Sequence, residues 1–494
     1  MTDPAARVHA PEFPPGLEWF NVAAPLSLRA LRGKVVLLDF WTYGCINCMH
    51  ILPDLKRLEQ KYRAELVVMG VHSAKFANEL QSENLRRILV RYDVDHPVVS
   101  DARFEIWKAY GARAWPTEVL IDPEGYVVGT ASGEGHGAAF DQAIAAVIEV
   151  FDAQHQIDRT PLALSPERER LAMGTLAFPG KVQVDEVSQR LFIADSNHHR
   201  VLVATLDGHV QDVVGDGTFG WTDAAFADAR FYRPQGLTLR GDTLFVADTE
   251  NHVVRAVSLR ARAVTTAAGT GRQAAWGGTG GAARETSLSS PWDVLAQGSL
   301  VFVAMAGVHQ IWMLDLERGL VLPYAGSGRE ARVDGPADEA AFAQPSGLAL
   351  DGSTLFVADS EANIIRAIAL PPKNDVRTLV GGDLFEFGDR NGAGDDVRLQ
   401  HPLGVACADG FVYIADTYNH KIKRLDPRTR RVTTFAGTGD PGHTDGASTT
   451  ARFYEPGGLD ATATALYVAD TNNHAIRRVS LADGQTETVE IRLP

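Results

Sequence analysis

The sequence predicts two domains of different class, an α/β layered domain followed by an all-β propeller of six blades. Up to about residue 150, strand-like runs alternate with helical stretches, and from about residue 175 a short phrase recurs six times between Gly-rich turns. A chain of 494 residues is also too long for one hydrophobic core. We therefore expect the first domain at 1–152, a linker at 153–175 that contains Pro161 and Pro166, and the propeller at 176–494.

The pattern of the first domain is typical of a central sheet covered by helices. The run 34–40 is apolar throughout, as expected for a strand buried on both faces. Further strands are predicted at 66–71 and 118–122. Helices are predicted at 45–62, 79–91 and 140–151, and the first of them places Ile51, Leu55 and Leu58 on one face.

The second domain is a repeat of strands with a regular spacing. An aromatic residue, Val or Ile, Ala and Asp follow one another in five copies, and a sixth copy ends in Met. Each copy is preceded by a strand that begins with Pro, and the copies are 53 to 57 residues apart. Several strands per repeat at this period predict propeller blades. The copies end at Asp195, Asp248, Met305, Asp359, Asp416 and Asp470.

The clearest chemical motif is Cys45-Ile46-Asn47-Cys48, which stands where the first strand gives way to the first helix. The free N–H groups and the positive end of a helix dipole stabilise an anion there. A thiolate is the reactive form of cysteine, so this position predicts that Cys45 is activated. Cys48, one helical turn later, is placed to attack a mixed disulfide and release the partner.

Over roughly residues 15–150 this motif and its surroundings resemble the thioredoxin superfamily. Asp39 matches the buried acid of that family that accepts a proton, and Pro53 matches the proline of its active-site helix. Trp115-Pro116-Thr117 matches its cis-proline loop. The resemblance implies a redox disulfide Cys45–Cys48, proton transfer by Asp39, and a peptide-binding role for Pro116.

Residues 72–101 match the extra segment that the redoxin subgroup carries after its third strand. Gly44 departs from the family, which has an aromatic residue before the first Cys. The recurring Pro-x-Gly-Leu, Val-Ala-Asp-x-x-x-His and Gly-turn phrases of the second domain resemble NHL repeats. The whole chain therefore resembles the thioredoxin–NHL fusion proteins of the NHL repeat-containing protein 2 type.

Other uses of the Cys pair remain open. A structural zinc site needs four ligands, and the third cysteine, Cys407, is far along the chain and expected to be a buried, inert thiol. Thr42 and Cys45 match half of the peroxiredoxin motif, but Leu38 stands where that motif has Pro. The pair could also be vestigial or regulatory. We expect no metal and no cofactor.

Histidines recur four residues after each anchor of the repeat, with Asn363 in the fourth copy. One residue per blade is expected to serve the turn structurally by satisfying local backbone groups, and the recurring Asp residues likewise. The alternative is a metal in the central channel, as in propeller hydrolases and lyases. The histidines are His199, His252, His309, His420 and His474.

The net charge of −15 disfavours binding to nucleic acids and to anionic membranes. The chain has neither a long apolar run nor a secretory signal at its start, so a cytoplasmic protein is expected. The predicted function is thiol–disulfide exchange with a protein substrate, while the propeller binds or presents a protein partner. The alternatives are a non-catalytic interaction scaffold and a propeller hydrolase or lyase.

Overall fold

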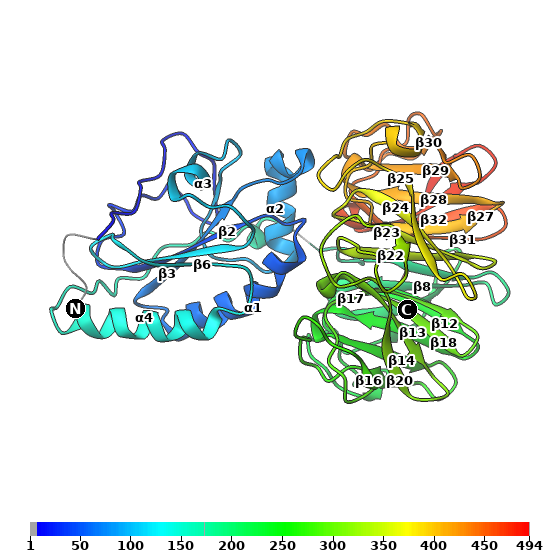
Figure 1. The fold of residues 1–494 in the computed structure, drawn as a ribbon, viewed down its shortest axis with the longest axis horizontal. Coiled ribbons are helices and arrows are strands. Elements are labelled where there is room, and N and C mark those ends of the chain that lie inside the picture. Colours follow the sequence, from blue (N-terminus) through cyan, green and yellow to red (C-terminus); the bar gives the residue numbers. More distant parts are fainter. Residues whose placement is uncertain (1–6, 172, 494) are drawn as a thin grey trace. The chain divides into compact units, whose positions relative to one another are not determined.

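The computed structural model describes residues 7–171 and 173–493, and the chain divides into two compact units, Met1–Ala172 and Met173–Pro494 (Figure 1). The first unit is an α/β domain and the second is an all-β propeller, so the predicted fold class is confirmed. Each unit has hydrophobic clusters of its own.

The first unit is built on one sheet of six strands in the order β1-β4-β3-β2-β5-β6. Strands β2, β3 and β4 are parallel, whereas β1, β5 and β6 pair antiparallel with their neighbours. The central strand β2 is buried along its whole length, as its apolar run predicts. The strands are β1 (Trp19–Phe20), β2 (Val35–Trp41), β3 (Leu66–His72), β4 (Val98–Ser100), β5 (Thr117–Ile121) and β6 (Val127–Ser132).

Helices α1 (Ile46–Lys61) and α4 (Gly137–Asp152) cover one face of this sheet, and α3 (Glu105–Tyr110) lies on the other (Figure 1). The helix predicted at 79–91 is shorter in the structure. A 3-10 turn at Ala77–Leu80 comes first, and α2 runs over Ser82–Arg91. The two are separate because Gln81 is extended, with φ −81° and ψ 120°.

The chain after α4 continues along the first unit. The Asp158 amide donates to the Gly33 carbonyl at 2.8 Å, and Lys34 Nζ donates to the Thr160 carbonyl at 2.6 Å. Further along, the Glu167 amide donates to Asn21 Oδ1 at 2.9 Å. Residues 158–167 are therefore bound to the α/β unit by backbone and side-chain hydrogen bonds.

The second unit consists of six antiparallel sheets, which are the six predicted blades. Blade 1 consists of β7 (Val182–Asp185), β8 (Arg190–Asp195), β9 (Arg200–Thr205) and β10 (Val210–Val214). Blade 2 consists of β11 (Ala224–Ala225), β12 (Pro234–Arg240), β13 (Thr243–Asp248), β14 (Val253–Ser258) and β15 (Ala263–Ala268). Blade 3 consists of β16 (Gly281–Ala282), β17 (Pro291–Gln297), β18 (Leu300–Met305), β19 (Gln310–Asp315) and β20 (Leu320–Ala325). Blade 4 consists of β21 (Gly335–Pro336), β22 (Pro345–Asp351), β23 (Thr354–Asp359), β24 (Ile364–Ala369) and β25 (Asp375–Val380). Blade 5 consists of β26 (Gly392–Ala393), β27 (Gly404–Ala408), β28 (Phe411–Asp416), β29 (Lys421–Asp426) and β30 (Arg431–Ala436). Blade 6 consists of β31 (Pro456–Ala461), β32 (Ala465–Asp470), β33 (Ala475–Ser480) and β34 (Thr486–Val489).

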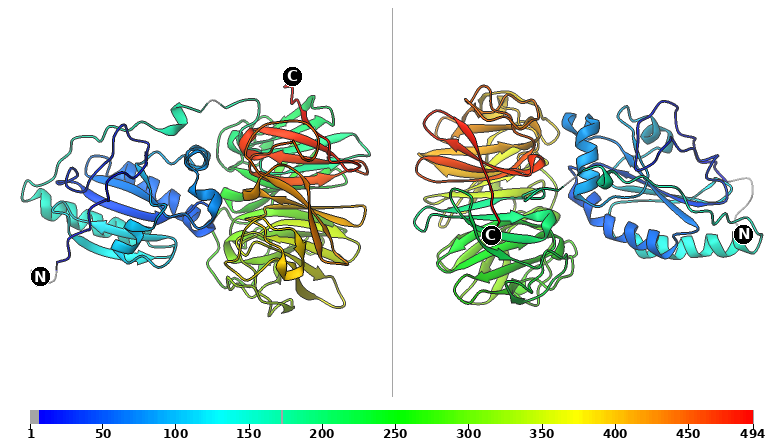
Figure 2. Two further views of the ribbon diagram at one scale, coloured as in Figure 1. Left: turned by 90° about the horizontal axis from the view of Figure 1, so that it is seen from above. Right: turned by 180° about the vertical axis from the view of Figure 1, so that it is seen from behind.

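The blades follow one another in chain order, and the last returns to the first (Figure 2). Strand β31 packs beside β7, and the chain after β34 pairs with the first blade. There the Val210 amide donates to the Arg492 carbonyl and the Arg492 amide to the Gly208 carbonyl, both at 2.9 Å. Backbone hydrogen bonds between the two ends of the unit therefore help to close the ring.

Alternate blades contain the same buried cluster. In blade 6 the fully buried Arg477 donates to Asp470 at 2.8 Å and to Asp445 at 2.6 Å, and lies over the Phe453 ring at 5.3 Å. The residues that repeat this arrangement in blades 2 and 4 are Arg255, Asp248, Asp223 and Phe231, and Arg366, Asp359, Asp334 and Phe342.

Because the main strands of a blade run alternately up and down, its connections divide between two faces. The 3-10 turn after the second strand and the long loop after the outermost strand lie on one face, which we call the long-loop face. The β-hairpin turns lie on the other, the hairpin face. The long loops are 215–223, 269–280, 326–334, 381–391 and 437–446.

Candidate functional site

The Cys pair stands at the start of α1, as predicted. Cys45 is the N-cap residue, with an extended backbone at φ −104° and ψ 115°, and Cys48 lies in the first turn. Both are free thiols and both are buried, with Cys45 6% exposed. The first turn of α1, all of it described, has no acidic side chain that would oppose a thiolate there.

Asp39 lies on β2 beneath the Cys pair and is fully buried. Neither of its carboxylate oxygens has a hydrogen-bond partner among the described residues. Burial, and then the negative charge of Glu118, raise the pKa of Asp39 well above its usual range. Burial also raises the pKa of Cys48, to which the hydrogen bond with Cys45 and the charge of Asp39 contribute. The two groups are therefore electrostatically coupled.

The loop that precedes β5 contains a cis peptide bond between Trp115 and Pro116. Pro116 is buried, and its carbonyl accepts a hydrogen bond from the Gly133 amide at 2.9 Å. The Trp115 indole donates to the Ser73 carbonyl at 3.0 Å and packs against Trp107, with ring centroids 4.6 Å apart. Contacts on both sides thus fix the loop in place.

Glu79 is a buried acid of the site that the sequence analysis missed. It lies in the 3-10 turn before α2, and its carboxylate accepts hydrogen bonds from the Thr42 hydroxyl and the Gly44 amide, the latter at 2.9 Å. The amides of Lys75 and Phe76 donate to it as well, at 2.8 and 3.4 Å. Burial raises the pKa of Glu79 to about 7, although these hydrogen bonds lower it. The extra segment therefore holds the loop that leads into Cys45.

The same contact explains why Gly44 replaces the aromatic residue of the family. A Cβ at this position would stand 2.8 Å from Glu79 Oε1 and 2.9 Å from the Phe76 ring. The carboxylate and the ring fill the space of a side chain at position 44. A signal was present in the sequence, since an acid and an aromatic residue occur together in the extra segment, 32 to 35 positions after Gly44.

Two further polar atoms near Asp39 are buried without a hydrogen-bond partner in the described chain. They are Trp41 Nε1 at the end of β2 and His72 Nε2 at the end of β3, and these residues are paired in the sheet register. Burial lowers the pKa of His72 to about 3. Its ring stacks on Tyr43, with centroids 5.6 Å apart. The His72 imidazole, which is neutral near pH 7, thus packs between the rings of Trp41 and Tyr43.

The propeller histidines have a structural role, but it is not the local one expected. His474 Nδ1 accepts a hydrogen bond at 3.0 Å from the Phe178 amide, which belongs to the next blade around the ring. Each of the six equivalent residues has a positive φ, between 51° and 60°. The other five bonds join His199 to Arg233, His252 to Ser290, His309 to Gln344, Asn363 to His401 and His420 to Glu455.

A lysine ammonium group occupies the propeller's central channel. Lys181 Nζ lies 3.0 Å from Asp293 Oδ2 and donates to the carbonyls of Ser346 and Leu403, both at 2.7 Å. These four residues belong to four different blades. Burial raises the pKa of Asp293, and the Lys181 charge opposes that shift. The described part of the chain has no group of three or more His, Cys, Asp or Glu side chains placed to hold a metal ion.

Cys407 lines a channel cavity of about 310 Å³, and it is half-buried rather than fully buried as expected. It is on β27, one of the six innermost strands, whose side chains reach the channel. Burial, followed by the charges of Asp351 and Asp460, raises the pKa of Cys407 to about 12. A thiol with such a pKa is a poor nucleophile near neutral pH.

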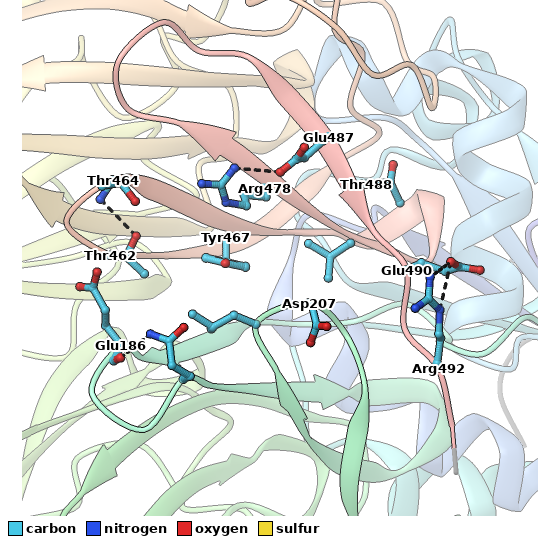
Figure 3. A pocket seen from close by; sticks show the side chains of 13 residues that line it. Glu186, Asp207, Thr462, Thr464, Tyr467, Arg478, Glu487, Thr488, Glu490 and Arg492 are labelled. Carbon is cyan, nitrogen blue, oxygen red and sulfur yellow. Dashed lines mark hydrogen bonds and ion pairs between the residues drawn. The ribbon is translucent and has the colours of Figure 1, made fainter.

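A surface pocket of about 600 Å³ lies between blades 1 and 6, where the ring closes (Figure 3). Its arginines have acidic partners within the pocket, since Arg478 donates to Glu487 at 2.8 Å and Arg492 to Glu490. The Tyr467 side chain lies between Arg478 and Glu186 of the first blade (Figure 3). The pocket is thus lined by charges that are already paired.

Known proteins match both units. A family model described as thioredoxin-like matches residues 33–127. Residues of the first unit are 33% identical over 109 positions to the thiol-disulfide oxidoreductase ResA of Halalkalibacterium halodurans, which covers 22% of this chain and 59% of that protein. With the six blades, these matches define a protein in which a thioredoxin-like domain precedes an NHL-type propeller.

The similarity to two longer proteins extends over nearly the whole chain. NHL repeat-containing protein 2 of Bos taurus is 42% identical over 518 residues, which is 97% of this chain and 71% of that protein. SUPPRESSOR OF QUENCHING 1, chloroplastic, of Arabidopsis thaliana is 44% identical over 499 residues, and the chain spans about half of its length, 47%. The chain belongs to the NHL repeat-containing protein 2 family. Among the described residues, we find no helix long and apolar enough to cross a membrane.

Proposed function

We propose that the first unit catalyses thiol–disulfide exchange with a protein substrate. The Cys45 thiolate attacks a substrate disulfide, forms a mixed disulfide and releases one substrate thiol. Cys48 then gives its proton to Asp39 and attacks Cys45 Sγ, which releases the second substrate thiol and leaves the Cys45–Cys48 disulfide. The first leaving thiolate takes its proton from solvent, and Asp39 returns the Cys48 proton to the second. Two electrons thus pass from the protein to the substrate, and the reverse sequence oxidises a dithiol.

The observation that carries this proposal is the buried, unpartnered carboxyl of Asp39 beneath two free thiols at a helix N-terminus. A carboxyl without a hydrogen-bond partner costs folding free energy, so its retention favours a role in proton transfer. We also propose a peptide-binding role for the Pro116 loop, whose Trp115 is held in place by Ser73 and Trp107. The name of ResA describes the same chemistry for that protein.

The propeller is proposed to bind a protein partner of the exchange reaction, in a cytoplasmic protein that needs neither metal nor cofactor. The Lys181–Asp293 ion pair in its channel and the paired charges at its closing seam support a binding role more than a hydrolase or lyase site. A reducing compartment would return the pair to the dithiol form. The second candidate is an interaction scaffold with an inactive Cys pair, because Cys48 is fully buried.

Trapping of the mixed disulfide tests the proposal. Cys48→Ser removes the resolving thiol, so reducible adducts should accumulate when the full chain is incubated with cell extract. Cys45→Ser should trap little, and Cys407→Ser is the matched control that should behave as wild type. Oxidation with excess oxidised glutathione should remove two of three titratable thiols in the wild-type protein.

Two results would change this assignment. Equal trapping by both single variants would overturn Cys45 as the nucleophile. No adduct with either variant, together with three free thiols after oxidation, would favour the scaffold.

A further inference from the structure

Four large aromatic side chains are exposed on the long-loop face of the propeller. In most proteins such side chains are largely buried, and exposed apolar patches mark interaction sites. Two of the four are in the loop 215–223, one in the next loop and one in the loop 381–391. Their exposed fractions are 63% for Phe219, 43% for Trp221, 70% for Trp276 and 67% for Phe385.

The two tryptophans are held in place by the neighbouring blade. Trp221 Nε1 donates to Thr266 Oγ1 at 2.8 Å, and its ring lies so close to Gly271 that a Cβ there would stand 2.2 Å from it. Trp276 Nε1 donates to the Gly328 carbonyl at 2.9 Å. Each indole is therefore fixed while part of its ring faces solvent. Because these side chains are already ordered, binding of a ligand to them would cost little conformational entropy of the protein.

An exposed arginine follows each of these glycines, Arg272 after Gly271 and Arg329 after Gly328. Neither guanidinium forms an ion pair within the described residues, although most other arginines of this unit have an acidic partner. Glu330 is the acidic residue next in sequence. At two consecutive blade junctions, an indole is thus held against a glycine, and the arginine that follows this glycine has no ion pair within the described residues.

We propose that Phe219, Trp221, Arg272, Trp276 and Arg329 form a docking surface for an extended protein segment that carries carboxylate and apolar side chains. This inference rests on the proposed partner-binding role of the propeller. Tryptophan and arginine are the residues that most often dominate binding energy at interfaces. The unpaired arginines select an acidic segment. An RNA strand is disfavoured because the chain carries −15, and Arg272 and Arg329 are the two cations that this surface contributes.

The test measures fluorescence anisotropy of a labelled peptide of alternating Glu and Leu residues mixed with the full chain. The Glu peptide should bind, and the same peptide with Lys in place of Glu should not. Trp276→Ser and the double variant Arg272→Glu/Arg329→Glu should each weaken binding by about tenfold or more. Added salt should weaken binding to the wild-type protein and should have much less effect on the Arg272→Glu/Arg329→Glu variant.

Matched controls lie on the hairpin face. Val187→Ser removes an apolar side chain that is 96% exposed, and Arg428→Glu reverses an exposed charge. Both should leave the affinity unchanged. Equal binding of the Glu and Lys peptides, loss of binding in either control, or no binding at all would overturn the surface. Tighter binding of an oligouridylate would replace the protein segment by nucleic acid. The probes contain no cysteine, so none of these results depends on the exchange reaction, which trapping tests separately.

Discussion

Asp39 in the α/β unit and Asp470 in the propeller are both fully buried carboxyls on apolar strands, and burial raises the pKa of both. Their surroundings differ completely. Asp470 accepts hydrogen bonds from the Tyr454 amide, from Asn473 and from Arg477, at 2.7 to 2.8 Å. Asp39 has no hydrogen-bond partner within the described chain.

The number of hydrogen-bond partners therefore distinguishes the two acids. Asp470 stabilises the fold, whereas Asp39 is buried at a cost in the free energy of folding. A satisfied buried charge is paired and hydrogen-bonded on every side, and removal of its partner is strongly destabilising. An unsatisfied one lowers stability, so its presence next to two thiols favours a chemical role. The same substitution at the two positions should therefore have opposite effects.

The largest expected effect is that of Asp470→Leu. It leaves the Arg477 guanidinium buried without this carboxylate and should lower the free energy of unfolding of the propeller by about 3–5 kcal/mol. Guanidinium unfolding, followed by hydrogen exchange of the 465–470 strand, measures it. Arg428→Leu on an exposed turn is the control and should cost less than about 0.5 kcal/mol. A loss of similar size in both variants would remove the basis of the comparison.

Asp39→Leu should do the reverse. Removal of an unsatisfied buried carboxyl should leave the first unit equally stable or raise its free energy of unfolding by about 1–3 kcal/mol. The same variant should slow release of the mixed disulfide by about 10²-fold, because Cys48 loses its proton acceptor. Stopped-flow measurement of reduction of a model disulfide, with Asp39→Asn as the control of similar shape, separates the two effects. A destabilised variant with unchanged kinetics would show that Asp39 is structural.

His474→Ala sharpens the comparison inside the propeller. The Phe178 amide loses its acceptor at the junction that closes the ring, so we expect a loss of about 1–3 kcal/mol. His474→Asn should restore much of it, because Asn363 accepts the equivalent bond in the fourth blade at 2.8 Å. Thermal unfolding of both variants checks this, with His443→Ala, an exposed histidine, as the control. Equal losses with Ala and Asn would contradict the hydrogen-bond account.

The last prediction concerns the pH dependence of stability and Glu79. Its pKa is about 7 in the folded chain, above the ordinary value of 4.5. Between these values the unfolded chain has lost a proton that the folded chain keeps, so the first unit loses stability as pH rises. Glu79→Gln should flatten that decline by up to about 1.4 kcal/mol per pH unit. Unfolding curves between pH 4.5 and 7 measure the slope, and an unchanged slope would mean that Glu79 does not titrate there.

Much of the fold was predictable because its signals are local. The apolar run of β2, the helix that begins after Cys45 and the Pro-led strands of the blades depend on near neighbours in the chain. The Cys pair could be located for the same reason. The helix start predicted at residue 79 was wrong, because Glu79 bonds to a distant loop and the chain is extended at Gln81.

What the sequence did not reveal are contacts between groups that are far apart along it. Glu79 reaches Gly44 across 35 positions, and His474 reaches Phe178 across 296. The expected local role of the histidines failed for this reason, since a periodic residue shows that each blade uses it but not which blade it contacts. Lys181 and Asp293 replace the glycine of the Pro-x-Gly-Leu phrase in the first and third copies, a signal that the sequence analysis did not use.

The buried arginines also bear on how such a ring can change in length. Arg255 and Arg366 are 111 positions apart, and so are Arg366 and Arg477. The buried cluster around arginine thus repeats every two blades, over stretches of that length. Recombination that adds or removes one such stretch would keep every arginine with its own two carboxylates. Loss of a single blade would instead place unlike neighbours side by side.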